Sequence, residues 1–153
     1  MDEELTKDQQ EKIHEHYHNP KNMKALTNYS ARGIGRNPDN WGQVDMYLLV
    51  DENGIITDLG YEFKGCPTIA FTASVFTEEL KGSPLQEAYE DTQAELDIQN
   101  AQNSCDDCIK MILVAFIAAY ANFNERIAGT NLEDYTLHMI EITAPKTEMS
   151  CGS

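Results

Sequence analysis

The chain has 153 residues, of which 41% are hydrophobic and 24% charged, and this predicts one domain that can bury a core without disulfide bonds. Its 26 acidic and 11 basic residues give a formal net charge of −15, which disfavours binding to nucleic acid or to anionic membranes and favours a basic partner or cations. The longest apolar run, residues 111–120, is too short to span a bilayer, and the acidic start lacks a secretory signal, so we expect a cytoplasmic protein with reduced cysteines.

A first helix is predicted over about residues 7–18, with Thr6 as its cap and an Asn-Pro pair closing it. Three histidines occur at alternate positions near its end. Residues two apart on a helix do not face each other, and only His14 and His18 share a face, with His16 turned away. We therefore interpret the three histidines as solvated surface side chains, not as a metal site.

A β-hairpin is predicted in the first half of the chain. Apolar residues alternate over 44–50 and again over 55–63, and residues 51–54 between them have the composition of a turn. The preceding stretch, residues 19–41, has neither a helical nor a strand period. It contains several asparagines and glycines, and we expect a surface loop there.

An amphipathic helix is predicted to follow Cys66, because apolar residues recur at helical spacing from Ile69 to Leu80 and Gly82 then ends the pattern. Cys66 thus lies at a helix start. The unpaired N–H groups and the macrodipole of such a start favour an anion, and so favour the thiolate that binds metals and accepts sulfur. The alternative is a small cysteine buried in the core.

The second half of the chain is predicted to be mainly helical. A helix starts near Ser83 and runs to about residue 89 or beyond, and the acidic stretch 90–103, with Leu96 and Ile98 as its large anchors, is interpreted as mobile. A long helix follows from about residue 104 to Gly129. It is apolar on nearly all sides and is therefore expected to be central.

The end of the chain carries weaker patterns. Residues 135–143 alternate weakly and are predicted as an extra edge strand. Residues 144–153 are interpreted as a disordered tail that contains Cys151.

The region around Cys66 also carries a family resemblance. The residues concerned are Phe63, Gly65, Cys66, Ile69, Ala70, Ser74, Thr77, Glu78, Lys81 and Gly82. Together with the run Glu11 to Asn22, which ends in His-Tyr-His-Asn-Pro-Lys-Asn, they resemble the NifU/IscU-type (SufU-like) iron-sulfur cluster assembly scaffold family. The resemblance covers roughly residues 11–127.

The resemblance implies an α+β fold: a small antiparallel three-stranded sheet with helices packed on one face. It also implies a single domain over residues 1–143, with 144–153 as the tail. In the family, three cysteines and an aspartate, sometimes with a histidine, form a metal or cluster site. Here the second family cysteine corresponds to Cys66 and the third to Cys105, with Cys108 one turn further on.

The chain departs from the family at the first cysteine. The slot of the family's Cys-Gly-Asp triplet holds Trp41, Gly42 and Gln43, so two ligands are absent together. Trp41 is either an ordinary loop anchor or a plug for the vacated slot, and we favour the plug. Residues 98–102 hold no counterpart of the Leu-Pro-Pro-Val-Lys chaperone-docking motif of one family branch.

Two arrangements of the remaining cysteines are open. Cys105 and Cys108 are spaced i, i+3 and can share a helix face, so with Cys66 they form a three-thiol site whose fourth ligand is an Asp, a His, Cys151 or a residue of another subunit. Alternatively, Cys108 is buried core, and only Cys66 and Cys105 approach each other.

The function predicted from these features is a divergent scaffold that binds iron, an iron-sulfur cluster or zinc through Cys66, Cys105 and Cys108. Its expected partners are a cysteine desulfurase and cluster acceptor proteins. The alternative is a metal-free partner of a desulfurase, which either accepts sulfur or regulates assembly. The sequence has no G-x-S-x-G motif, no phosphate loop and no paired catalytic carboxylates, so we do not expect an enzyme.

Overall fold

The fold is built from the residues that the computed structural model describes, which are 6–37, 42–65, 69–101, 107–128 and 135–138. The elements are α1 (Lys7–His18), β1 (Ala31–Asn37), β2 (Gly42–Val50), β3 (Ile56–Lys64), α2 (Ile69–Leu80), α3 (Leu85–Ala101), α4 (Asp107–Ala128) and β4 (Tyr135–His138). The strands form one sheet in the order β3-β2-β1-β4.

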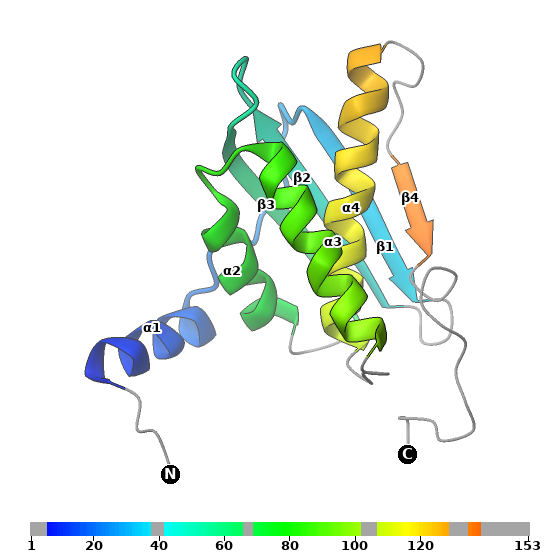
Figure 1. The fold of residues 1–153 in the computed structure, drawn as a ribbon. Helices are drawn as coiled ribbons and strands as arrows, with labels where there is room; N and C mark the ends of the chain where they lie inside the picture. The colour runs from blue at the N-terminus through cyan, green and yellow to red at the C-terminus, as the bar shows by residue number, and fades with distance from the viewer. Residues whose placement is uncertain (1–5, 38–41, 66–68, 102–106, 129–134, 139–153) are drawn as a thin grey trace, which may run out of the picture.

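Helices α2, α3 and α4 cover one face of this sheet (Figure 1). Strands β1, β2 and β3 are antiparallel, which confirms the predicted α+β class with three antiparallel strands and helices on one face. The short strand β4 joins the edge of the sheet parallel to β1, within the range of the predicted extra strand. Residues 139–143 of that predicted strand lie outside the described residues.

The hairpin of β2 and β3 forms the base of the core. Met46 pairs with Tyr61 and Leu48 with Leu59, and these four side chains are fully buried beneath the helices. Gly54 takes a φ of 81° in the connecting turn, a conformation that glycine adopts without strain. The alternation seen in the sequence therefore reports the inner face of this hairpin correctly.

Strand β1 lies within the stretch that was predicted as a surface loop, and that prediction is wrong for residues 31–37. Residues 31–37, expected to be irregular, pair with β2 along their whole length. The positions of β1 that face the helices are occupied by Gly33 and Gly35. A Cβ on Gly33 would lie 2.1 Å from the backbone nitrogen of Ala119 in α4, so the helix backbone occupies the space that apolar side chains normally fill. Without such side chains the strand has no detectable hydrophobic period.

Helix α4 is central, as predicted. Its fully buried side chains include Met111, Val114, Ala115, Phe116, Ala118 and Ala119. The helix is longer than the apolar run 111–120. By length and composition Ile109–Ala128, with a mean hydropathy of 1.2, is long and apolar enough to cross a membrane. Half of that window is buried inside the fold, so its apolar character is accounted for by its packing against the sheet and α3.

The acidic stretch that was predicted to be mobile is helical up to Ala101, so the prediction is wrong for residues 90–101. The helix continues to Ala101, and its buried side chains are Leu85, Ala88, Thr92 and Leu96. They recur at helical spacing, but Ala88 and Thr92 are too small or too polar to mark the stripe in the sequence. The second predicted anchor, Ile98, is 48% exposed.

The sheet face opposite the helices carries paired polar side chains beside the buried Ile34. The Arg32 guanidinium lies 2.5 Å from the Asp45 carboxylate, and the Tyr47 hydroxyl donates a hydrogen bond to Glu62. Burial, together with that hydrogen bond, raises the pKa of Tyr47 to about 12. The phenol is therefore neutral throughout the physiological range and remains available as a donor.

Candidate functional site

Two of the segments at the predicted site adjoin the same end of the sheet. Strand β1 ends at Asn37, which pairs with Gly42 at the start of β2, and Gln43 pairs with Lys64 at the end of β3. The connection 38–41 therefore begins and ends beside the point where the chain leaves β3 toward Cys66. This places the flanks of the vacated family slot and of Cys66 next to each other.

Gly65 shows why a glycine precedes Cys66. Its φ is 106°, which residues with a side chain rarely adopt. A Cβ at this position would also lie 2.8 Å from the Cα of Gly42. The turn out of β3 thus needs glycine for its conformation and for its close approach to β2.

The start of α4 reaches the same end of the sheet. Gly35, two residues before the end of β1, lies so close to α4 that a Cβ there would be 2.6 Å from the carbonyl oxygen of Met111. Met111 is in the second turn of α4, whose first turn contains Cys108. Cys105 precedes the helix by two positions. The elements that border the three predicted thiols therefore converge.

The structure does not describe the three predicted thiol groups themselves. Cys66 and Cys105 lie outside the described residues, as does Trp41, and only the backbone of Cys108 is described. The predicted ligand set thus stays a prediction. In the part of the chain that the structure describes, no group of three or more His, Cys, Asp or Glu side chains is placed to hold a metal ion.

Gln43, which stands in the slot of the family's aspartate, is engaged on the polar face of the sheet. Its amide nitrogen donates to the Asp45 carboxylate at 2.6 Å, and its amide oxygen accepts from the Arg36 guanidinium at 3.1 Å. Both ends of the amide are therefore occupied.

His16 fastens α1 to α2. Its Nδ1 lies 2.5 Å from the Ser74 hydroxyl, and its Nε2 lies 3.0 Å from the Glu78 carboxylate. The Ser74 hydroxyl also accepts the backbone N–H of Lys21 at 2.6 Å. One consistent arrangement has Nε2–H donating to Glu78 and the hydroxyl of Ser74 donating to Nδ1.

The prediction of three solvated histidines is therefore wrong for His16, which is 7% exposed. It is correct for His14, which is exposed, and for His18, whose ring centroid lies 4.1 Å from that of His14 and which is exposed as well. The single buried ring fits the helical geometry, because one of three alternate positions is turned toward the neighbouring helix. A histidine at the surface of an isolated helix becomes buried only when α2 is packed against it.

A second set of hydrogen bonds joins the turn after α1 to the end of α2. The Asn22 amide donates to the Thr77 hydroxyl at 2.9 Å and accepts from the Lys81 ammonium at 2.8 Å. Asn22 has a φ of 65°, which asparagine tolerates better than most residues. Lys81 also pairs with Asp58 of β3 at 3.2 Å.

These contacts explain the family motif in structural terms. The sequence marks Ser74, Thr77, Glu78 and Lys81 only as matching positions, and the structure shows that they hold α2 against α1 and β3. This framework fixes the position of α2, which begins at Ile69, three residues after Cys66.

Asp58 makes the framework sensitive to acid. Burial raises the pKa of Asp58, but the hydrogen bond from Lys81, the backbone N–H of Leu59 and the nearby ammonium charges outweigh it, so the pKa is lowered overall. A carboxylate with a lowered folded pKa contributes stability above its unfolded pKa of about 3.9 and loses it as the pH falls through the folded value.

We expect Asp58→Asn to lower the free energy of unfolding at about pH 7 and to flatten its decline toward about pH 3. Urea titrations followed by circular dichroism at both pH values measure the difference. Asp91→Asn, which alters an exposed carboxylate on α3, is the control and should keep the acid dependence of the native protein. Equal pH slopes for the Asp58 variant and the native protein would contradict the assignment.

Comparisons with known proteins identify the family and agree with the fold described above. The chain belongs to the family of the NifU-like N terminal domain, whose family model matches residues 8–130. It is 33% identical over 81 residues to the iron-sulfur cluster assembly scaffold protein IscU of Haemophilus influenzae, which covers 51% of this chain and 64% of that protein. It is 28% identical over 122 residues to IscU of Escherichia coli K12, which covers 75% of this chain and 95% of that protein.

Two of these matches are partial. The chain spans less than two thirds of the Haemophilus protein, and only 26% of the nitrogen fixation protein NifU of Azotobacter chroococcum, to which it is 34% identical over 82 residues. Among solved structures, it is similar to a Fervidobacterium islandicum protein described as a cluster assembly scaffold for the SUF system, with a TM-score of 0.52 and 19% identity. That alignment covers 73% of this chain and 90% of the other, and it supports the fold.

Proposed function

We propose that this protein is a scaffold for iron-sulfur cluster assembly. It holds iron, sulfide or an assembled cluster as cargo on the thiolates of Cys66, Cys105 and Cys108, and then passes the cargo to an acceptor protein. The observation that carries this proposal is the convergence of the elements bordering these cysteines at one end of the sheet, in a chain that belongs to the NifU-like family. Its relatives in Haemophilus and Escherichia are named as such scaffolds.

The chemistry of the donor set fits this cargo. Thiolates are the preferred protein ligands of iron-sulfur clusters and also bind zinc, so zinc is a second possible occupant of the same site. Cys66 and Cys105 each precede a helix by a few residues. From this position in the sequence we expect the positive ends of α2 and α4 to favour the thiolate over the thiol. The fourth ligand comes from an Asp, a His, Cys151 or a second subunit.

A sulfur acceptor without a stable metal is the second candidate. The observation that favours it is the engaged amide of Gln43, because neither a thiolate nor a carboxylate is supplied there. In this candidate the thiolate of Cys66 attacks the outer sulfur of a desulfurase persulfide. A persulfide forms on Cys66, and the desulfurase cysteine leaves as its thiolate.

Both candidates share their partners. A cysteine desulfurase supplies the sulfur, and in the scaffold role cluster acceptor proteins receive the cargo. Both require cysteines kept reduced, so we place the protein in the cytoplasm. Neither role requires this chain to catalyse a reaction by itself, and its named relatives are scaffolds.

Metal analysis of protein purified without oxygen separates the two candidates. We expect about one metal ion or cluster per chain, lost in Cys66→Ala and in Cys105→Ala because each removes a thiolate ligand. Iron, zinc and acid-labile sulfide are measured on the same preparations, and circular dichroism confirms that the variants fold. Cys151→Ala tests the fourth ligand, because metal retained in this variant excludes Cys151 and metal lost assigns it.

A metal-free native protein would favour the second candidate. Native protein that carries neither iron nor zinc, yet increases the turnover of a cysteine desulfurase, would overturn the scaffold role in favour of the sulfur acceptor. In that case mass spectrometry after incubation with desulfurase and cysteine should find one added sulfur atom on the native chain. The Cys66→Ala chain should lack it.

A further inference from the structure

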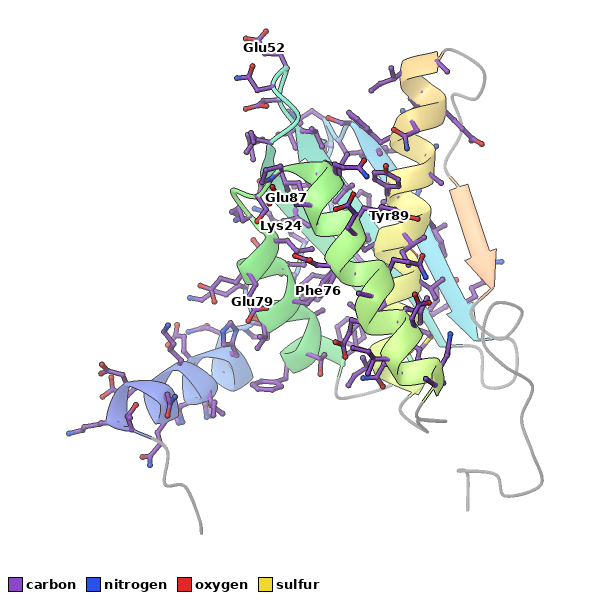
Figure 2. The ribbon with its side chains drawn as sticks, in the orientation of Figure 1. Lys24, Glu52, Phe76, Glu79, Glu87 and Tyr89 are labelled. Atoms are coloured by element: carbon purple, nitrogen blue, oxygen red, sulfur yellow. The ribbon has the colours of Figure 1, made fainter. Side chains whose placement is uncertain are left out.

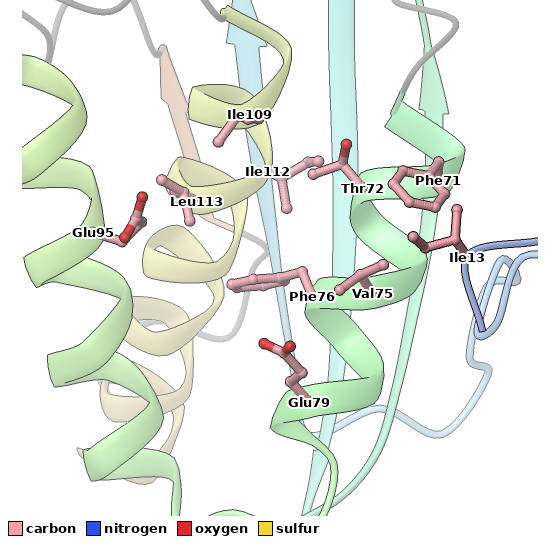
Figure 3. A pocket seen from close by; sticks show the side chains of 10 residues that line it. All are labelled: Ile13, Phe71, Thr72, Val75, Phe76, Glu79, Glu95, Ile109, Ile112 and Leu113. Atoms are coloured by element: carbon pink, nitrogen blue, oxygen red, sulfur yellow. The ribbon is translucent and has the colours of Figure 1, made fainter. Parts of the chain in front are cut away.

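An open groove lies between α2 on one side and α3 and α4 on the other (Figure 3). Its volume is about 410 Å³. Ile13 of α1 lines one end of this groove. The rest of the apolar lining, which we call the α2–α4 groove, consists of Phe71, Val75, Phe76, Ile109, Ile112 and Leu113.

The floor of this groove belongs to the core, whereas its upper walls reach solvent. Ile112 and Leu113 are buried, and Phe76 packs edge to face against the core residue Phe116 with ring centroids 5.8 Å apart. Val75 and Ile109 are only partly buried. The groove is thus an apolar concavity on a rigid base, a form that accepts side chains from outside.

Two acidic side chains flank the groove from opposite sides. Glu79 projects from α2 and Glu95 from α3, and both are exposed (Figure 3). Within the described part of the chain neither forms an ion pair, although Glu95 accepts a hydrogen bond from the Gln99 amide. An apolar floor between two unneutralised carboxylates is complementary to an apolar segment that carries positive charges on both sides.

We infer that the α2–α4 groove is a docking site for an amphipathic helix of a partner protein, one whose apolar face is bordered by lysine or arginine. Helices bind such grooves by inserting apolar side chains at i, i+3, i+4 and i+7 spacing. The net charge of −15 opposes a second copy of this chain as the occupant, and it attracts a basic segment.

The groove runs toward the end of the sheet where the cysteine segments begin. Phe71 lies in the first turn of α2 and Ile109 in the first turn of α4. A docked helix therefore contacts the two helices that follow Cys66 and Cys105. The inference does not depend on the cargo, since it rests on the shape and charge of the groove alone.

The test uses synthetic peptides of roughly 18 residues, long enough to form a helix. One peptide has leucines at i, i+3, i+4 and i+7 with lysines on both borders, and the second carries glutamates in place of the lysines. Fluorescence anisotropy measures their affinities for the full chain, and chemical-shift mapping on labelled protein locates the bound peptide. We expect the lysine peptide to bind and to shift resonances of groove residues.

Charge exchange then tests specificity. Glu79→Lys with Glu95→Lys should weaken the lysine peptide at least about tenfold, which is about 1.4 kcal/mol, and should allow the glutamate peptide to bind. The matched control is Glu52→Lys with Glu87→Lys, which makes the same change in net charge away from the groove (Figure 2). It should change the affinity by less than about twofold, because exposed charges beyond a Debye length are screened.

Three results would overturn the inference. The first is an equal loss of affinity in the two double variants, which shows attraction by net charge alone. The second is chemical shifts that map away from the groove. The third is tighter peptide binding by a chain shortened after His138, which shows that the protein's own C-terminal residues occupy the groove.

Discussion

Gly33→Ala should destabilise the protein by about 4 kcal/mol or more, a loss large enough to unfold a domain of ordinary stability. The added Cβ would lie 2.1 Å from the backbone nitrogen of Ala119 and 2.5 Å from the carbonyl oxygen of Ala115. Backbone atoms inside a helix cannot rotate aside as a flexible side chain can. The substitution therefore requires β1 to separate from α4, which is the largest contact in the core.

Gly54→Ala is the matched control for this prediction. Gly54 has a φ of 81°, but a Cβ added there would meet no atom within 4 Å, so alanine costs only the left-handed conformation, about 1–2 kcal/mol. Chemical denaturation followed by circular dichroism compares the two variants with the native protein. A Gly33→Ala protein as stable as Gly54→Ala would show that β1 and α4 are not packed this closely.

Ser74→Ala is expected to cost about 2–4 kcal/mol, because it leaves unpaired one ring nitrogen of the buried His16 and the N–H of the half-buried Lys21. The hydroxyl of Ser74 is fully buried, and it serves both the Nδ1 of His16 and the backbone N–H of Lys21. Urea denaturation of the single variant measures the cost.

A double-mutant cycle separates this network from a simple loss of packing. His16→Leu removes one of the two groups that Ser74→Ala leaves unpaired, so the double variant should be less destabilised than the sum of the single variants by about 1 kcal/mol or more. Strict additivity would contradict a direct bond between the two side chains. The same variants should also displace the start of α2, so their metal content is worth measuring beside that of Cys66→Ala.

The local signals in the sequence predicted those elements whose pattern is carried by their own side chains. Thr6 caps α1 and forms a reciprocal capping pair with Gln9, as an isolated helix would allow. The hairpin shows its buried face through alternation. Helix α2 ends at Leu80, and Gly82, with a φ of 92°, follows two residues later. The glycine before Cys66, one of the residues that carry the family resemblance, has a φ of 106° that residues with a side chain rarely adopt.

The same signals failed where contact with another element decides the structure. Strand β1 presents glycines to α4, and the stripe of α3 contains Ala88 and Thr92, so neither shows the large apolar residues that mark a buried face. His16 is buried only because α2 supplies Ser74 and Glu78 to its two ring nitrogens. Such positions have ordinary composition, and their role depends on partners that are distant in the chain, as Ser74 is from His16 and Ala119 is from Gly33.

Helices α1, α2 and α4 and the hairpin could be read from the sequence, as could the absence of the family's Cys-Gly-Asp triplet. These features depend on residues that lie close together in the chain. Only the tertiary structure decided that β1 pairs beside the hairpin, that the elements bordering the cysteines converge at one end of the sheet, and that Gln43 is committed to Arg36 and Asp45. It also formed the α2–α4 groove. The physical reason is that burial and hydrogen bonding across elements arise from packing, which no local pattern encodes.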